Sequence, residues 1–195
     1  MRSATVNRET RETRIVITLH VDGSGQSRID CPIGFFSHML DAFARHGLFD
    51  LDLWARGDLN VEAHHLVEDC GLVLGQAFSQ ALGDKSGIVR CGFFLMPMDE
   101  ALAEVAVDLC GRPNCFFQGY LGESPLGDFI PALVQEFLIA FSQSLMATIH
   151  VHIRGGRNDH HKLEAVFKAL GRAMQSACRI ESRLQGQALS SKGVI

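Results

Sequence analysis

The pentad His-His-x-x-Glu occurs twice in this chain, at His64–Glu68 and again 96 residues later at His160–Glu164. The similarity continues beyond the pentads, because 7 of 18 positions match when His64–Ala81 is aligned with His160–Ala177. The matched residues after the glutamate are leucine, glycine and alanine at helical spacing, which indicates that each helix packs closely against a neighbour. A repeat with a period of about half the 195 residues predicts a duplicated half-domain.

The residue types of the pentad are those that bind transition metals. Histidine and carboxylate side chains are the usual ligands of Zn, Mn, Fe and Co ions. On a helix, residues i and i+4 lie on one face, so His64 can share an ion with Glu68, and His160 can share another with Glu164. The second histidine of each pair is rotated by about 100° and points elsewhere. Each pentad is therefore expected to serve two metal centres.

Hydrophobic periodicity predicts strands that precede helices in both halves of the chain. The expected strands are Arg14–Val21, Phe49–Ala55, Ala101–Leu109 and Ala147–Ile153. The expected helices are Phe35–His46, His64–Leu82, Ile130–Gln143 and His160–Cys178. This order indicates an α+β fold in which each half is a mixed or antiparallel sheet with helices on one face. We expect one domain over residues 1–195, with halves at about 8–95 and 96–185 and a C-terminal tail at 186–195.

The bulk composition excludes several classes of protein. A hydrophobic fraction of 47% and a charged fraction of 21% are ordinary for a globular domain. The net charge of −4 argues against a nucleic-acid surface, and no apolar run is long enough to span a membrane. The six cysteines form no CxxC pair, and the N-terminus carries no apolar signal segment, so we expect reduced thiols in a cytoplasmic protein.

Other histidines and acids stand near the pentads. His38 lies on the first expected helix and His150 on the strand before the second pentad, so both are candidate ligands. The remaining histidines, His20, His46 and His152, are treated as structural or surface residues. Asp69 and Asp159 flank the pentads and are candidates to orient ligating imidazoles by accepting the second ring N–H. A solvated helix position explains Asp69 equally well.

Three basic segments adjoin glycine or serine. They contain Arg90 in GIVRCG, Arg112 in CGRP, and the tail sequence Ser190-Ser191-Lys192-Gly193. Guanidinium groups, an ammonium group and hydroxyls beside flexible backbone suit a phosphate monoester. Any one of these taken alone is explained by a solvated surface charge, and the tail is the most suggestive of the three.

Taken together, the chain closely resembles imidazoleglycerol-phosphate dehydratase, a family of histidine-biosynthesis enzymes. The resemblance spans Arg8 to Ile195, and the paired HHxxE with PMDE and SSKG is highly specific. The segments that carry it are GFFSHMLDAFARHGLFDL, AHHLVEDCGLVLGQA, MPMDEALAEVAVDLCGRP, GRNDHHKLEAVFKALGRA and SSKGVI.

The resemblance implies a reaction, a metal and an assembly. The family converts D-erythro-imidazole glycerol phosphate to imidazole acetol phosphate and water. Its duplicated α+β chain assembles as 24 copies, with two Mn ions at sites between neighbouring subunits. Carried over by position, one ion would be bound by His64, Glu68, His150 and His160. The other would be bound by His38, His65, His161 and Glu164.

The resemblance also implies residues that contact the substrate. The phosphate would meet Arg90, Arg112, Lys168, Ser190 and Lys192, while Glu12 and Asp99 would lie near the glycerol moiety and the reacting centre. Two metals on the ring nitrogens can hold an imidazolate, whose electron density helps to expel hydroxide. A carboxylate then moves protons, with Glu164 as the first choice and Glu12 as the second.

Three positions depart from the family pattern. The family commonly has aspartate where Ser37 and Ala63 stand here, and often glutamine where Ala42 stands. Ser37 and Ala63 remove possible hydrogen-bond acceptors beside the metal ligands, so altered metal affinity is expected. The ligands themselves are intact.

Two other classes of protein fit part of the pattern. A non-catalytic metal-binding cage or storage assembly would keep the histidines, but it would not need the SSKG tail, Arg90, Arg112 or Asp99. A metallohydrolase would favour HExxH, whereas here the glutamate follows both histidines.

Overall fold

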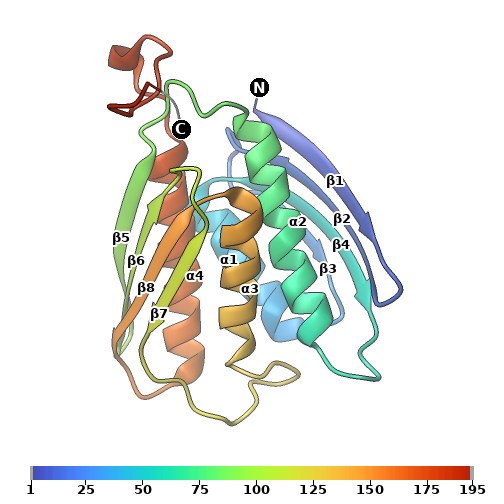
Figure 1. Cartoon of the computed structure of the whole chain (residues 1–195). Coiled ribbons are helices and arrows are strands. Elements are labelled where there is room, and N and C mark those ends of the chain that lie inside the picture. Colours follow the sequence, from blue (N-terminus) through green and yellow to red (C-terminus); the bar gives the residue numbers. More distant parts are fainter. Residues whose placement is uncertain (1, 194–195) are drawn as a thin grey trace.

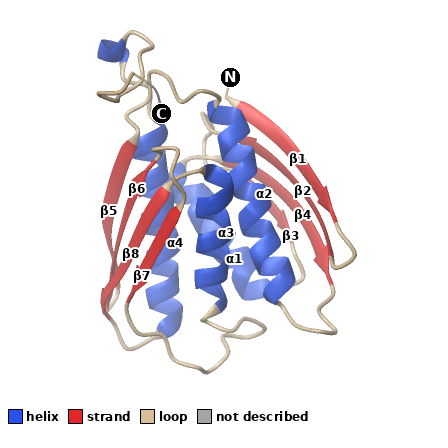
Figure 2. Cartoon of the chain, viewed as in Figure 1, coloured by secondary structure: helices blue, strands red, loops and turns tan. Residues whose placement is uncertain are grey.

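Two four-stranded sheets enclose a layer of four helices (Figures 1 and 2). The computed structural model describes residues 2–193. The first half comprises β1 (Ser3–Glu9), β2 (Thr13–His20), β3 (Ser27–Asp30), α1 (Gly34–Gly47), β4 (Asp50–Gly57) and α2 (His64–Leu82). The second comprises β5 (Cys91–Met98), β6 (Ala101–Asp108), β7 (Asn114–Gln118), α3 (Leu133–Leu145), β8 (Thr148–Gly155) and α4 (Asp159–Cys178), followed by a short 3-10 helix, Ser182–Leu184.

The two halves repeat one topology. The strand order is β1-β2-β4-β3 in the first sheet and β5-β6-β8-β7 in the second. In each sheet the first three strands of that order pair antiparallel, and the last pairs parallel with its neighbour. The expected α+β duplication of two mixed sheets is therefore confirmed. The expected boundary near residues 95 and 96 falls inside β5, and the element order divides the halves between Leu82 and Cys91.

Alternating side chains explain why the central strands form. Along β2, Ile15, Ile17 and Leu19 are fully buried while their neighbours face outward. Along β6, alternate positions from Ala101 to Val107 do the same. A strand with this period buries one face, and that face packs on the helix layer. Each sheet thus contributes one face to a shared core.

The helices meet in pairs at glycines. α2 packs on α3, and α1 packs on α4, so both contacts join the two halves. A Cβ atom on Gly75 would lie 2.5 Å from the Phe141 carbonyl oxygen, and one on Gly171 would lie 2.4 Å from that of Phe43. These glycines occupy matched positions of the repeat, so the expected close packing at small residues is confirmed there.

The helix predictions agree with the structure better than the strand predictions. α1, α2 and α4 begin and end within one residue of their expected limits, while α3 begins three residues later than expected. Four strands, β1, β3, β5 and β7, were not expected. They lie at the edges of the sheets and bury few side chains; β1 buries only Val6, and β5 exposes Phe93. Within residues 2–193, none of the helices is long and apolar enough to cross a membrane.

We predict that Gly75→Ala and Gly171→Ala each lower the free energy of unfolding by about 1–3 kcal/mol, because a methyl group overpacks a backbone contact. The gain in helix propensity, about 1 kcal/mol, is too small to offset this. Denaturant unfolding followed by circular dichroism measures the change. Gly34→Ala, where the nearest atom is 3.8 Å from the added Cβ, is the control and should be neutral or stabilising. Equal midpoints for all three variants would contradict the role given to these glycines.

Candidate metal centre and anion-binding end

One cluster of three candidate ligands forms within the described residues. His38 comes from α1, and His160 and Glu164 come from the first turns of α4. The Nε2 atoms of His160 and His38 lie 3.1 and 3.5 Å from Oε2 of Glu164. One ligand atom from each residue lies within 4.8 Å of the other two, so these imidazole nitrogens and carboxylate oxygens can share one ion.

This cluster differs from the grouping that the resemblance implied, and that grouping stays a prediction. The resemblance implied that His38 and Glu164 share an ion with His161, while His160 serves the other ion. The structure instead places His160 with His38 and Glu164, as the i,i+4 geometry predicts. His161 is turned away from Glu164 towards the β5–β6 turn, where its ring nitrogens face Glu100 and Asp99.

Glu164 is held as a carboxylate. Lys168, one turn further along α4, pairs with Oε1 at 2.7 Å, while Oε2 faces the two histidines. Burial raises the pKa of the Glu164 carboxyl, but the hydrogen bond and charge of Lys168, with the nearby His38 and His160, outweigh burial and lower the pKa overall. An ionised, nearly buried carboxylate is suited to metal ligation.

The first pentad forms a smaller group. His64 Nε2 lies 3.6 Å from Oε2 of Glu68, so these two side chains share one face of α2 as expected. Both side chains are more than one-third exposed, which leaves them accessible to further ligands. Glu12 lies near this group, because its carbonyl accepts the N–H of Asp58 (3.0 Å), a residue that contacts His65.

The second histidine of each pentad hydrogen-bonds a carboxylate. His65 Nδ1 lies 3.1 Å from Asp58 Oδ2, and His161 Nδ1 lies 2.8 Å from Glu100 Oε2. These hydrogen bonds raise the pKa of both imidazoles. The His161 contact, with the backbone N–H of Asn158, lowers the pKa of Glu100 to about 2. A carboxylate can only accept, so the ring proton lies on Nδ1.

Asp69 and Asp159, the acids expected to orient the histidines, contact other residues instead. Asp69 accepts from Thr13 Oγ1 and from Arg8 Nε (2.9 Å), so it ties α2 to the first sheet. Asp159 accepts from the Gly122 N–H and pairs with Lys162. Asp58 and Glu100 supply the acceptors instead. Neither contact could be predicted from the sequence, because Asp58 is seven residues from His65 and Glu100 is 61 residues from His161.

The other candidate positions near the ligands are also placed. His150 lies on β8 between the buried Ile149 and Val151, so it faces away from the helix layer, and its ring stacks on Phe116 at 4.6 Å. The Ser37 hydroxyl donates to the carbonyls of Ile33 and Cys31. The positions of Ala42 and Ala63 offer no polar side chain.

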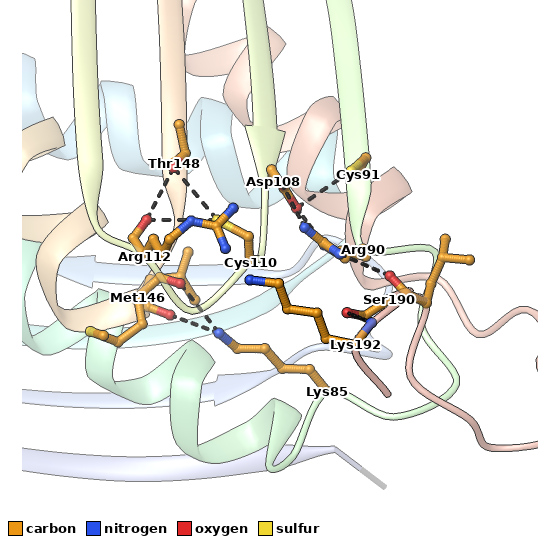
Figure 3. Close-up of polar contacts among 12 residues, drawn as sticks. Lys85, Arg90, Cys91, Asp108, Cys110, Arg112, Met146, Thr148, Ser190 and Lys192 are labelled. Atoms are coloured by element: carbon orange, nitrogen blue, oxygen red, sulfur yellow. Dashed lines mark hydrogen bonds and ion pairs between the residues drawn. The ribbon is translucent and has the colours of Figure 1, made fainter. Parts of the chain in front are cut away.

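Four of the expected phosphate residues gather at the opposite end of the second sheet (Figure 3). Arg90 donates Nε and Nη2 to both oxygens of Asp108, at 2.7 and 2.9 Å, and Nη1 to the Leu189 carbonyl at 2.9 Å. It thereby ties the tail, with Ser190 and Lys192, to the sheet. Within residues 2–193, the charged ends of Arg112 and Lys192 have no ion-pair partner, which leaves two cationic groups for an anion.

Sequence reasoning missed Lys85, which lies beside these cations (Figure 3). It is buried, and its Nζ donates to the Leu145 and Met146 carbonyls at the end of α3. Burial lowers the pKa of its ammonium group from the ordinary value. The Met146 carbonyl also accepts the N–H of Gly111, so Lys85 steadies the turn that carries Arg112. The turn sequence Gly-Asp-Lys-Ser predicts an exposed lysine, and no pattern in the sequence indicates that it is buried.

The two ends lie far apart within one chain. The Arg90 N–H donates to the Ala177 carbonyl near the end of α4, whereas Glu164 is near its start. Thirteen residues of helix separate them by about 20 Å. Lys168 belongs to the metal end through its pair with Glu164, so the structure does not bring it together with Arg90 in one chain.

Fold and site together define a duplicated α+β protein with a candidate transition-metal centre at one end and an anion-binding group at the other. The sequence profile described as "Imidazoleglycerol-phosphate dehydratase" matches residues 31–174. Enzymes of that name from Gluconacetobacter diazotrophicus and Koribacter versatilis are 50% and 49% identical to the chain; both alignments cover 100% of it, and 98% and 100% of the relatives.

Solved structures agree with this result. The chain resembles a Staphylococcus aureus imidazoleglycerol-phosphate dehydratase with a TM-score of 0.83 and 36% identity, over 92% of this chain and 99% of that one. A Pyrococcus furiosus structure of IGPD in complex with (S)-C348 has a TM-score of 0.85 and 34% identity, over 97% and 100%. The chain belongs to the imidazoleglycerol-phosphate dehydratase family. This confirms the resemblance and supports the expected enzyme class, a hydro-lyase.

Proposed function

We propose that this chain converts D-erythro-imidazole glycerol phosphate to imidazole acetol phosphate and water, in the histidine biosynthesis of the cytoplasm, with two Mn²⁺ ions per active site. Family membership supports the reaction. The observation that carries the metal proposal is the cluster of His38, His160 and Glu164, whose ligand atoms lie within 4.8 Å of one another. Imidazole nitrogens combined with carboxylate oxygens suit Mn²⁺, and they suit Fe and Co as well.

We assign the ligands by the geometry of the pentads. His38, His160 and Glu164 would hold one ion, and the His64–Glu68 pair would begin the other site. His65, His150 and His161 face away from these groups within one chain. They would complete the sites of neighbouring subunits. When bound, the two ions would stabilise a deprotonated imidazole ring and so help hydroxide to leave.

Glu12 and Glu164 can divide the acid–base work. The sequence favours Glu164 for proton transfer, whereas the geometry favours Glu12. Both oxygens of Glu164 are engaged by Lys168 and the two histidines. The Glu12 carboxylate is exposed and, within residues 2–193, has no hydrogen-bond or ion-pair partner. We propose that Glu164 binds metal and that Glu12 moves the proton, with Asp99, close to His161, contacting the glycerol hydroxyls.

We propose that the phosphate group lies among Arg90, Arg112, Ser190 and Lys192 of one subunit and the metals and Lys168 of another. The three carbons of the glycerol chain extend about as far as one or two residues, roughly 4–7 Å. One chain separates its metal end from its cation end by about 20 Å along α4. A substrate that contacts both therefore needs two copies of the chain. The 24-subunit assembly of the family would supply the neighbouring copy.

The first prediction is that the purified protein dehydrates imidazole glycerol phosphate, loses the activity after chelation and regains it with Mn²⁺. Product formation is followed directly, with Zn²⁺ and Mg²⁺ as comparison metals. Absence of product at every metal loading, with Mn²⁺ still bound, would support the non-catalytic metal-binding cage instead.

The second prediction separates the two glutamates. Glu164→Gln and Glu12→Gln should each lower kcat by about 10²–10⁴-fold, and both should leave the assembly intact. Glu164→Gln should also weaken Mn²⁺ binding, because the neutral amide is a poor metal ligand, while Glu12→Gln should keep wild-type affinity. Glu104→Gln, which removes only a surface pair with Arg154, is the control. A wild-type kcat in Glu164→Gln would remove that residue from the mechanism.

The third prediction tests whether two chains build one site. His38→Ala disables the metal end and Lys192→Ala disables the cation end, so each homogeneous protein should be nearly inactive. When the two variants are unfolded, mixed and refolded together, some sites should combine an intact metal end with an intact cation end and regain activity. Mixed assemblies, identified by two different affinity tags, that stay inactive would show that both ends must come from one chain.

A further inference from the structure

The second histidine of each pentad is held through the same ring atom. His65 presents Nδ1 to both oxygens of Asp58, at 3.1 and 3.3 Å, and His161 presents Nδ1 to Glu100 at 2.8 Å. We propose that Asp58 and Glu100 are positioning residues that fix the Nδ1–H tautomer of these histidines, so that each Nε2 carries the lone pair for a metal ion. In His161 the Nδ1 contact with Glu100, at 2.8 Å, is closer than the 3.5 Å approach of Asp99 to Nε2. This inference rests on the metal site of the proposed function.

A carboxylate fixes the tautomer because it has no proton to give. A neutral imidazole carries one N–H, and an ionised carboxylate beside Nδ1 draws that proton to Nδ1. The lone pair is then on Nε2, the atom that a metal would take. The same contact fixes the plane of the ring and makes Nε2 a stronger electron-pair donor to a metal ion.

Glu100 is itself held rigidly. Its Oε1 accepts the backbone N–H groups of Arg157 and Asn158, at 3.1 and 2.9 Å, while Oε2 takes the His161 ring. One oxygen thus secures the turn before α4, and the other secures the histidine. Asp58 is anchored through its backbone, since its N–H donates to Glu12 and its carbonyl accepts from Val61.

The two carboxylates come from non-equivalent places in the repeat. Asp58 directly follows β4, whereas Glu100 lies in the turn between β5 and β6. The residue that follows β8, the counterpart of β4, is Gly156. Duplication therefore did not copy one pair into both halves. Each half reaches the same contact on the same ring atom by a separate route, which is expected if the contact serves the histidine rather than the local fold.

The anchoring of Glu100 makes an amide substitution informative. In Glu100→Gln, the two backbone N–H donors hold the amide oxygen at the Oε1 position. The amide NH₂ then faces Nδ1 of His161, and a donor there moves the ring proton to Nε2, where it blocks the metal. In Asp58→Asn, no backbone donors fix the amide, so its oxygen can turn to His65 and the tautomer can persist.

The experiment measures Mn²⁺ binding to the metal-free protein by titration with paramagnetic resonance at pH 8, where unpaired imidazoles are neutral. Glu100→Gln and Asp58→Ala should each weaken the affected binding by about 10–100-fold, the usual cost of removing such a partner. Asp58→Asn should lose less Mn²⁺ affinity than Asp58→Ala. Glu62→Gln, which removes a charge near His65 without a hydrogen bond, and Glu104→Gln are the controls and should bind as wild type.

Two further readouts separate positioning from folding. The thermal unfolding of metal-free Glu100→Gln should match wild type, because the backbone contacts of Oε1 are kept. Its ¹⁵N spectrum, recorded on histidine-labelled protein, should show one more Nε2–H ring than wild type. If wild type binds no Mn²⁺, the proposed metal function fails. If wild type binds Mn²⁺ and both Glu100→Gln and Asp58→Ala bind it as tightly as wild type, the positioning role is overturned. The same holds if Glu100→Gln binds Mn²⁺ more weakly than wild type without a change of tautomer.

Discussion

The contact of α1 with α4 determines where the candidate metal centre forms. At Gly171 no side chain lies between the two helices, and the backbone of α4 contacts the Phe43 carbonyl of α1 directly. Towards the N-termini of both helices, His38 lies about one turn before Phe43, and Glu164 and His160 lie about two and three turns before Gly171, where the three side chains meet. A larger residue at Gly171 would move α1 away from α4, and the 3.1 and 3.5 Å distances of the cluster leave little room for such a shift.

The equivalent contact in the other helix pair explains why the halves differ. Gly75 of α2 meets Phe141 of α3 as Gly171 meets Phe43. Five residues before Phe43, α1 has His38, whereas five residues before Phe141, α3 has Glu136. The first pentad therefore has no third imidazole from the helix packed against it, and within the described residues the three-ligand cluster forms at the second pentad alone.

Local sequence periodicity predicted much of the fold and part of the site. Helix limits followed from apolar spacing, and the contact of His160 with Glu164 followed from i,i+4 geometry. The edge strands were missed because they bury few residues, so the alternation is weak. Asp58, Glu100 and Lys85 were missed because their roles depend on contacts between turns and helix ends that are distant in sequence or show no periodic pattern.

The metal end and the cation end of the chain lie at opposite edges of the helix layer. The helices lie between the sheets, with their N-termini at one edge of this layer, while β5 begins and β6 ends at the other (Figure 1). The Arg90–Asp108 pair lies at these two strand ends, because Arg90 precedes Cys91 and Asp108 is the last residue of β6. His150 faces outward from the second sheet, away from both. Under the proposed function, the ion held by His38, His160 and Glu164 has three ligands from one chain, whereas an ion held by His64 and Glu68 has two. Under that proposal, the first ion would be able to bind before subunits associate, while the second would need ligands from a neighbouring subunit.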